Sequence, residues 1–253
     1  MSSSGWTPTN GFGNTSRLTG EIFSPLLGSR SSFIRQSANI WYLKKIIWEQ
    51  LREKLNADKD KVHIIDGFPM PVCHIKRASR GKLFKSEGAF GYCATKEQYY
   101  FGFKGHLLID SSGVISGFSL AAANIDERVA MFDVVPGIQG FLLGDKGYIV
   151  KEEVDDRLKE MGIQLETPLK CNMTDLRLKS YVARIMKTRR KIETVIGQLA
   201  ERFHMEKIRA RDLWHLTSRC FRKILSHTIG VFLNIQQGNK AIQLDNLLEF
   251  TAR

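Results

Sequence analysis

The sequence predicts an α/β fold built on a mixed sheet, and two observations indicate it. Short runs of β-branched and aromatic residues, typical of strands, alternate along the chain with longer amphipathic stretches, typical of helices. Two strand-like runs, at 99–109 and 114–120, flank a turn signal at 110–113 and predict an antiparallel hairpin. Strands that alternate with helices and include a hairpin favour a mixed sheet.

The other elements are expected in a simple order. In that order they are a helix over 32–55, a strand over 62–65 that ends at Asp66, a loop over 67–98, the hairpin, a short helix over 126–134, a strand over 141–144, a helix over 151–161, a strand over 163–165, and long helices over 179–203 and 212–236. The first helix is either a DNA-contacting appendage or a helix that packs on the main domain. Residues before it are rich in Ser, Gly, Thr and Asn and are expected to be irregular.

The charge of the chain indicates a polyanionic partner. The formal net charge is +12, from 38 lysines and arginines and 26 acidic residues. Basic side chains near phosphates release condensed counterions, so this excess favours a nucleic acid, although ribosome-associated and membrane-surface proteins share it. No apolar run reaches the length of a membrane span, and the start lacks a secretory signal. With four scattered cysteines, we expect reduced thiols in a cytoplasmic protein.

Three acidic residues occupy unusual places in this pattern. Asp66 and Asp145 each follow an apolar strand, and Glu193 lies beside the apolar stripe of a long helix. Ligands bind beyond the carboxyl ends of strands in open α/β sheets, so the two aspartates could meet there. Three carboxylates could hold Mg²⁺ or Mn²⁺, and two such ions would activate a water or a 3′-hydroxyl. The alternative is that these acids have no catalytic role, because Asp before Gly is a common turn pair and a helical Glu is usually solvated.

Four short segments carry a resemblance to a known family. The first, at 61–73, reads as an apolar strand, then Asp, Gly, Phe and Pro; the second, at 99–108, contains an aromatic-Gly-x-Lys-x-His pattern. The third, at 142–148, reads as apolar residues, Gly, Asp, Lys, Gly and Tyr, and the fourth, at 189–195, has Arg four positions before Glu. In this order and spacing, they resemble the DDE transposases of bacterial insertion sequences. The resemblance runs from about residue 30 to 235.

The resemblance implies a fold, a site and partners. It implies a ribonuclease-H-like mixed sheet flanked by helices at 58–238, after an irregular segment with a short helical appendage at 1–57 and before a tail at 239–253. Asp66, Asp145 and Glu193 would be the catalytic residues and hold Mg²⁺ or Mn²⁺, with two ions expected. Double-stranded DNA, as terminal inverted repeats and target, would be the partner, with a homodimer expected in the DNA complex. A DNA-binding remnant without activity and a ribonuclease-H-like nuclease are the alternatives.

Basic residues near these segments are the candidate DNA contacts, with solvated surface charge as the alternative for each. A basic loop follows Asp66 directly, and other basic side chains lie beside the remaining motifs. The candidates are Lys76, Arg77, Arg80, Lys82, Lys104, Lys146, Arg189 and Arg190.

Overall fold

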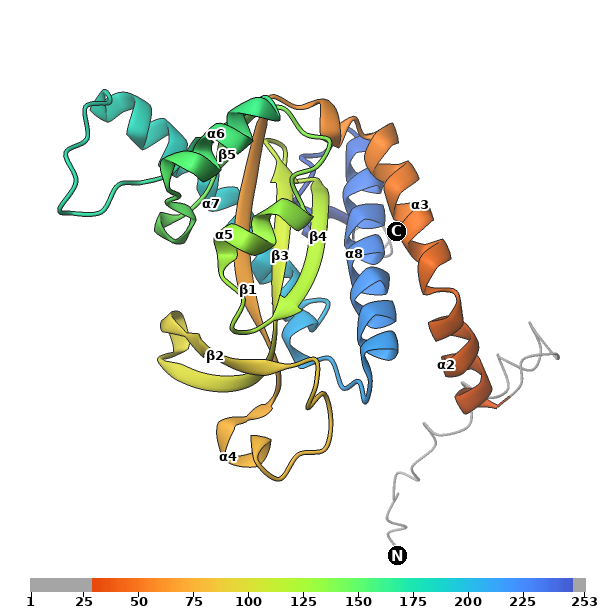
Figure 1. Ribbon diagram of the computed structural model, residues 1–253. Helices are drawn as coiled ribbons and strands as arrows, with labels where there is room; N and C mark the ends of the chain where they lie inside the picture. The colour runs from red at the N-terminus through yellow and green to blue at the C-terminus, as the bar shows by residue number, and fades with distance from the viewer. Residues whose placement is uncertain (1–28, 248–253) are drawn as a thin grey trace, which may run out of the picture. The chain divides into compact units, whose positions relative to one another are not determined.

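A mixed sheet of six strands forms the centre of the fold in a computed structural model that describes residues 29–247 (Figure 1). The strands are β1 (Val62–His74), β2 (Ala89–Cys93), β3 (Gln98–Asp110), β4 (Ile115–Ala122), β5 (Gly140–Leu143) and β6 (Ile163–Glu166). One edge of β3 pairs with β1, and the other pairs first with β2 and then with β4, all antiparallel. β5 pairs in parallel with β1 and with β6. The predicted mixed sheet and its hairpin are therefore confirmed.

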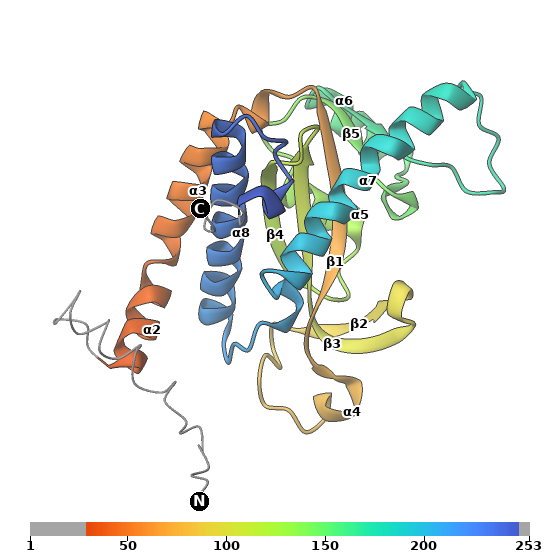
Figure 2. The same cartoon turned by 180° about the vertical axis from the view of Figure 1, so that it is seen from behind.

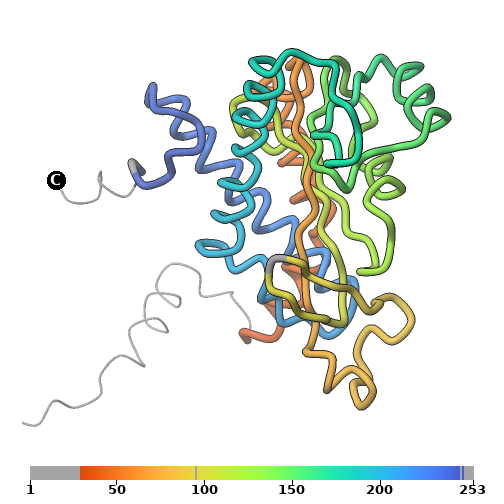
Figure 3. The backbone as a smooth tube through the Cα atoms, turned by 90° about the vertical axis from the view of Figure 1, so that its left-hand side faces the viewer, coloured from red at the N-terminus to blue at the C-terminus, as the bar shows by residue number. Residues whose placement is uncertain are grey.

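The helices that accompany this sheet are α3 (Trp41–Lys54), α4 (Ile75–Ala78), α5 (Glu127–Ala130), α6 (Glu152–Glu160), α7 (Lys179–Glu201) and α8 (Leu213–Gln236). Seen from behind, α7 crosses in front of the strands and α8 stands beside β4 (Figure 2). The side view places these two helices, cyan and blue, on one side of the strands and the green segments of α5 and α6 on the other (Figure 3).

The chain divides into two compact units, residues 1–39 and 40–253. The first unit contains α2 (Arg30–Asn39), and the sheet and the other helices belong to the second. Most of the predicted irregular N-terminal segment and the end of the predicted C-terminal tail lie outside the described residues. The domain boundaries at 57 and 238 stay predictions.

The two faces of the sheet carry separate hydrophobic cores, because successive side chains of a strand point to opposite faces. Ile64 and Leu107 belong to the core beneath α7 and α8, whereas their neighbours Ile65 and Leu108 belong to the core beneath α5 and α6. All four side chains are fully buried. A strand buried on both faces reads as a continuous apolar run, which is the pattern of residues 107–109, whereas residues 62–65 include the buried His63.

The first strand is longer than predicted. We expected it to end at Asp66, but β1 continues to His74 and pairs with β3 as far as Tyr100. Pro69 and Pro71 made this segment look like a loop, since proline cannot donate a ladder hydrogen bond. Proline is tolerated here because β5 already ends at Leu143, opposite Ile64, which leaves the outer edge of β1 without a partner strand. Asp66 therefore lies within a strand.

The single helix predicted over 32–55 is two helices, with a break at Ile40, whose backbone (φ −93°, ψ 22°) is not helical. α3 packs along α8 within the larger unit, and Trp48 is buried there against Phe221, with ring centroids 6.0 Å apart. Residues 41–54 thus form a packing helix of this unit.

The buried side of α8 carries more polar groups than an apolar stripe would suggest. His227, Thr228 and Asn234 are fully buried beside Ile224. Each of the three side chains makes a hydrogen bond: His227 Nε2 lies 2.9 Å from Oε1 of Gln198 on α7, Thr228 Oγ1 donates to the Ile224 carbonyl, and Asn234 donates to a carbonyl of the C-terminal segment. These bonds offset part of the cost of burying the polar groups.

We expect the stability of the protein to fall on acidification, partly through His227. Burial lowers the pKa of the His227 imidazole to about 4. The unfolded value is about 6.5, so the unfolded state binds more protons between these values, and stability is lost as the pH falls from about 6.5 towards 4. The contribution approaches about 1.4 kcal/mol per pH unit.

Urea unfolding across this pH range would measure the effect. His227→Gln should flatten the dependence of the free energy of unfolding on pH, and His74→Gln, at an exposed histidine, should leave it unchanged. Equal slopes for wild type and His227→Gln would contradict the assignment.

Candidate active site

A pocket opens at the outer edge of β1, just beyond the end of β5. The last pair between these parallel strands joins Ile64 to Leu143, and an aspartate follows two residues later on each strand, Asp66 and Asp145. Parallel strands end at the same edge of a sheet, so the two carboxylates come to one place. With Glu193 from α7, they line a pocket of about 550 Å³. The structure therefore brings the three predicted carboxylates together.

Asp66 is the most buried of the three acids. Its side chain is 21% exposed, its Oδ1 accepts a hydrogen bond from the Gly67 backbone at 2.8 Å, and its Oδ2 lies 3.4 Å from Nη1 of Arg189. Burial raises the pKa of the Asp66 carboxyl to about 6, and the charges of Asp145 and Glu127 add to this, while the Gly67 amide and Arg189 oppose it. Burial in this pocket therefore destabilises the charged form of the Asp66 carboxyl.

Asp145 is held by the turn that follows β5. Its Oδ1 accepts a hydrogen bond of 2.8 Å from the Gly147 backbone, so it caps the short 3₁₀ turn Lys146–Tyr148. Tyr148 is fully buried and lies against Gly144, where an added Cβ would come within 2.8 Å of the Tyr148 Cβ. Glycine before Asp145 thus allows the strand to turn sharply and present the carboxylate at the pocket.

Glu193 reaches the pocket from the boundary of a buried helix face. On α7, Ile192, Val195 and Leu199 are fully buried against the sheet, which confirms the predicted stripe. The Glu193 side chain is 54% exposed, and its Oε1 accepts a hydrogen bond of 2.8 Å from Nη2 of Arg189, one helical turn earlier. Because Arg189 also contacts Asp66, its guanidinium links the two carboxylates.

Glu127 is a fourth carboxylate in the pocket, and sequence analysis did not single it out. It is the first residue of α5, its side chain is 25% exposed, and its Oε1 accepts from Lys104 Nζ at 2.9 Å. A side chain at Gly147 would collide with Oε2 of Glu127, and one at Gly67 would come within 3.3 Å of Oε1. The carboxylate therefore lies between the part of β1 that carries Asp66 and the turn that follows Asp145. In the sequence it reads as an ordinary acidic residue at a helix start, so no local signal marked it.

The predicted DNA contacts fall into two groups. Lys104 and Arg189 line the pocket and are only 20% and 15% exposed, each paired with pocket carboxylates. Lys146 and Arg190 are exposed and lie outside the residues that line the pocket. The remaining four are exposed on the segment between β1 and β2: Lys76, Arg77, Arg80 and Lys82.

The pocket offers the ligand chemistry of a hard divalent cation. Oxygen donors of four carboxylates face it, and such donors are preferred by Mg²⁺ and Mn²⁺. Within residues 29–247, no three carboxylate, histidine or cysteine side chains already stand at coordinating spacing. Instead, Arg189 and Lys104 supply the positive charge that the acids require. The donor set thus fits a divalent cation in kind.

The sheet order and the helices on both faces define a ribonuclease-H-like fold, and its carboxylate pocket lies at the edge of the central strand. A family model described as "Transposase DDE domain" matches residues 56–213, and the chain belongs to this family. The match confirms the resemblance seen in the sequence and spans β1 to the start of α8. No curated protein matches the chain. In the part of the chain that the structure describes, no helix has the length and hydropathy to span a membrane.

Proposed function

We propose that this protein is a transposase that cleaves DNA at the ends of an insertion sequence and joins them to target DNA. Asp66, Asp145 and Glu193 are its catalytic residues. The observation that carries the proposal is that these three acidic residues, far apart in the sequence, line one pocket. Membership of the transposase DDE domain family supplies the reaction class.

The pocket residues have separate roles in this proposal. Asp66, Asp145 and Glu193 hold two Mg²⁺ or Mn²⁺ ions, which when bound polarise the phosphodiester and activate the attacking oxygen. Glu127 adds a fourth carboxylate on the side of α5. Arg189 is a positioning residue, because it orients Asp66 and Glu193 through its two Nη atoms. Lys104 positions Glu127 in the same way.

Double-stranded DNA is the proposed partner, both as the terminal inverted repeats and as the target. The net charge of +12 supports a polyanion. An exposed basic segment also follows β1, the strand that carries Asp66 into the pocket. A homodimer on the DNA is part of the same proposal, since two ends must be joined to one target.

The flanking DNA and an end-cleavage assay would test the proposal. Short inverted repeats should bracket the reading frame, and DNA carrying them should be nicked at the repeat end with Mg²⁺ or Mn²⁺ and joined to a second duplex. Cleavage without preference for the repeat would favour a ribonuclease-H-like nuclease. Specific binding without cleavage would favour an inactive DNA-binding remnant.

We expect duplex binding to weaken steeply with salt through the exposed basic segment. Replacing Lys76, Arg77, Arg80 and Lys82 together by Ala should flatten the plot of log affinity against log salt, by up to about 0.9 for each phosphate that is no longer neutralised. Fluorescence anisotropy at several salt concentrations measures the slope. A matched control removes exposed basic charge elsewhere, for example Lys159→Ala with Lys170→Ala. An unchanged slope in the fourfold variant would show that this segment is solvated surface.

A further inference from the structure

An aromatic face is exposed on the hairpin formed by β2 and the first residues of β3. It consists of Phe90, Tyr92 and Tyr99, which are 54%, 50% and 58% exposed. The register pairs Phe90 with Phe101 and Tyr92 with Tyr99, so these side chains share one side of the two strands. The ring centroids lie 4.8 Å apart in the tyrosine pair and 5.3 Å apart in the phenylalanine pair. The rings thus form two neighbouring pairs on one side of the hairpin, and Phe101 is the buried member.

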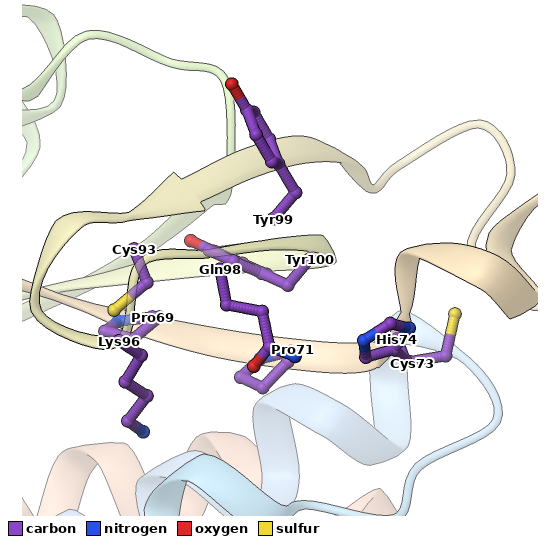
Figure 4. A pocket seen from close by; sticks show the side chains of 9 residues that line it. All are labelled: Pro69, Pro71, Cys73, His74, Cys93, Lys96, Gln98, Tyr99 and Tyr100. Carbon is purple, nitrogen blue, oxygen red and sulfur yellow. The ribbon is translucent and has the colours of Figure 1, made fainter.

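The other side of this hairpin packs against the rest of the fold. Gly91 lies so close to Ala123 that an added Cβ would come within 2.7 Å of the Ala123 Cβ, and Tyr100 is buried. Figure 4 shows Tyr99 pointing away from Cys93 and Gln98, and all three residues line a smaller pocket of about 210 Å³. The hairpin is therefore held from one side, and the three rings of the aromatic face stay about half exposed.

The aromatic face reaches the carboxylate pocket at one residue. Tyr92 belongs to the aromatic face and also lines the pocket that contains Asp66, Asp145 and Glu193. The next two residues of the hairpin, Cys93 and Ala94, line it as well. A strand whose phosphate sits among the carboxylates would therefore meet Tyr92 within the adjoining nucleotides.

The surrounding segment carries the charge that a nucleic acid needs. Residues 74–99 contain six lysines and arginines but only two glutamates. Five of the basic residues lie on the segment that leads into β2, whereas Lys96, in the hairpin turn, is paired with Glu206 at 2.6 Å. Exposed aromatic rings beside basic residues are the combination that binds single strands, because bases stack on the rings while the backbone follows the positive charge.

We propose that the aromatic face stacks against unpaired bases of the DNA strand whose phosphate occupies the carboxylate pocket. The proposal rests on the proposed function and adds the form of DNA that the site accepts. Bases within a duplex are already stacked and paired, so their faces are closed to these rings. The aromatic face therefore selects DNA that is unpaired next to the cleaved bond, such as a frayed or opened end.

Binding of two DNAs to the full chain, without divalent metal and at one salt concentration, tests this inference. One DNA is a complete duplex, and the other has the same sequence with one unpaired end. Wild type should prefer the second DNA. The double variant Tyr92→Ala with Tyr99→Ala should lose about tenfold or more of its affinity for that DNA and little for the duplex. The double variant Tyr92→Phe with Tyr99→Phe keeps the rings and should bind like wild type.

Tyr42→Ala is the matched control, because Tyr42 is 59% exposed on α3 and should affect neither DNA. Equal losses on both DNAs in the alanine variant would overturn the inference, as would an equal loss in the phenylalanine variant. A change in self-association with an unchanged DNA preference would also overturn it, by making the face an interface between copies of the chain.

Photo-crosslinking of wild type provides a test that does not depend on the folding of a variant. Iodouracil at the unpaired positions should crosslink to the peptide that contains Phe90, Tyr92 and Tyr99, and crosslinks found only elsewhere would overturn the inference. Both measurements are made without metal. An inactive protein with the expected binding preference would therefore contradict the proposed function alone.

Discussion

Asp66→Asn and Asp145→Asn are each expected to abolish DNA strand cleavage while leaving DNA binding nearly unchanged. Asparagine keeps the shape of the side chain but removes the negative charge that a divalent cation requires. Metal ions supply several kcal/mol of transition-state stabilisation, and each 1.36 kcal/mol is tenfold in rate, so the loss should be on the order of 10³-fold or more. Gel assays of nicking with Mg²⁺, beside anisotropy measurements of binding, would show both effects.

Asp156→Asn is the matched control for these variants. Asp156 is an exposed aspartate of α6, and its side chain is 59% exposed. The same loss of one negative charge there should leave cleavage unchanged. Cleavage at the wild-type rate by either pocket variant would remove that aspartate from the catalytic set.

Glu193→Gln and Glu127→Gln are expected to separate the roles of the two glutamates. Glu193 is proposed as the third metal-holding residue, so its variant should lose cleavage by about 100-fold or more. Glu127 lies against Gly67 of β1 and Gly147 of the turn after Asp145 and is paired with Lys104, so we expect its variant to weaken Mn²⁺ binding by about tenfold and to slow cleavage by a similar factor. Mn²⁺ titration followed by electron paramagnetic resonance measures the affinity without depending on activity.

The control for the glutamate variants is Glu153→Gln, at an exposed position of α6. If Glu193→Gln cleaved normally while Glu127→Gln did not, the third carboxylate would be Glu127, and α5 would replace α7 as its source. If Glu127→Gln bound Mn²⁺ like wild type, the Lys104 pair would be only a structural contact.

Much of the fold could be predicted from local patterns. The hairpin of β3 and β4, the helix α6 and the strand β6 follow from alternation, turn residues and apolar periodicity, all of which lie within a few neighbouring residues. Asp66, Asp145 and Glu193 were predicted as the site because each lies in a short segment that resembles a motif of the DDE transposases. The two aspartates were expected to meet beyond the carboxyl ends of their strands. In the structure, both line one pocket together with Glu193.

Other features depend on partners that are distant in the sequence. β1 runs through Pro69 and Pro71 only because β3 pairs with it on one side and β5 stops short on the other. Glu127 enters the pocket only because α5 packs beside the loop of Gly147. The residues next to Pro69, Pro71 and Glu127 in the sequence do not indicate these distant partners.

The type and order of most elements and the residues of the three carboxylate motifs are properties of the sequence alone, because they depend on side-chain periodicity and on short segments of chain. Packing in three dimensions decided that Arg189 joins Asp66 to Glu193, that Glu127 lies between β1 and the turn after Asp145, and that three rings on β2 and β3 remain half exposed. The physical reason is that ion pairs, close approaches and exposed faces are set by which surfaces pack together, and packing joins residues that no local pattern connects.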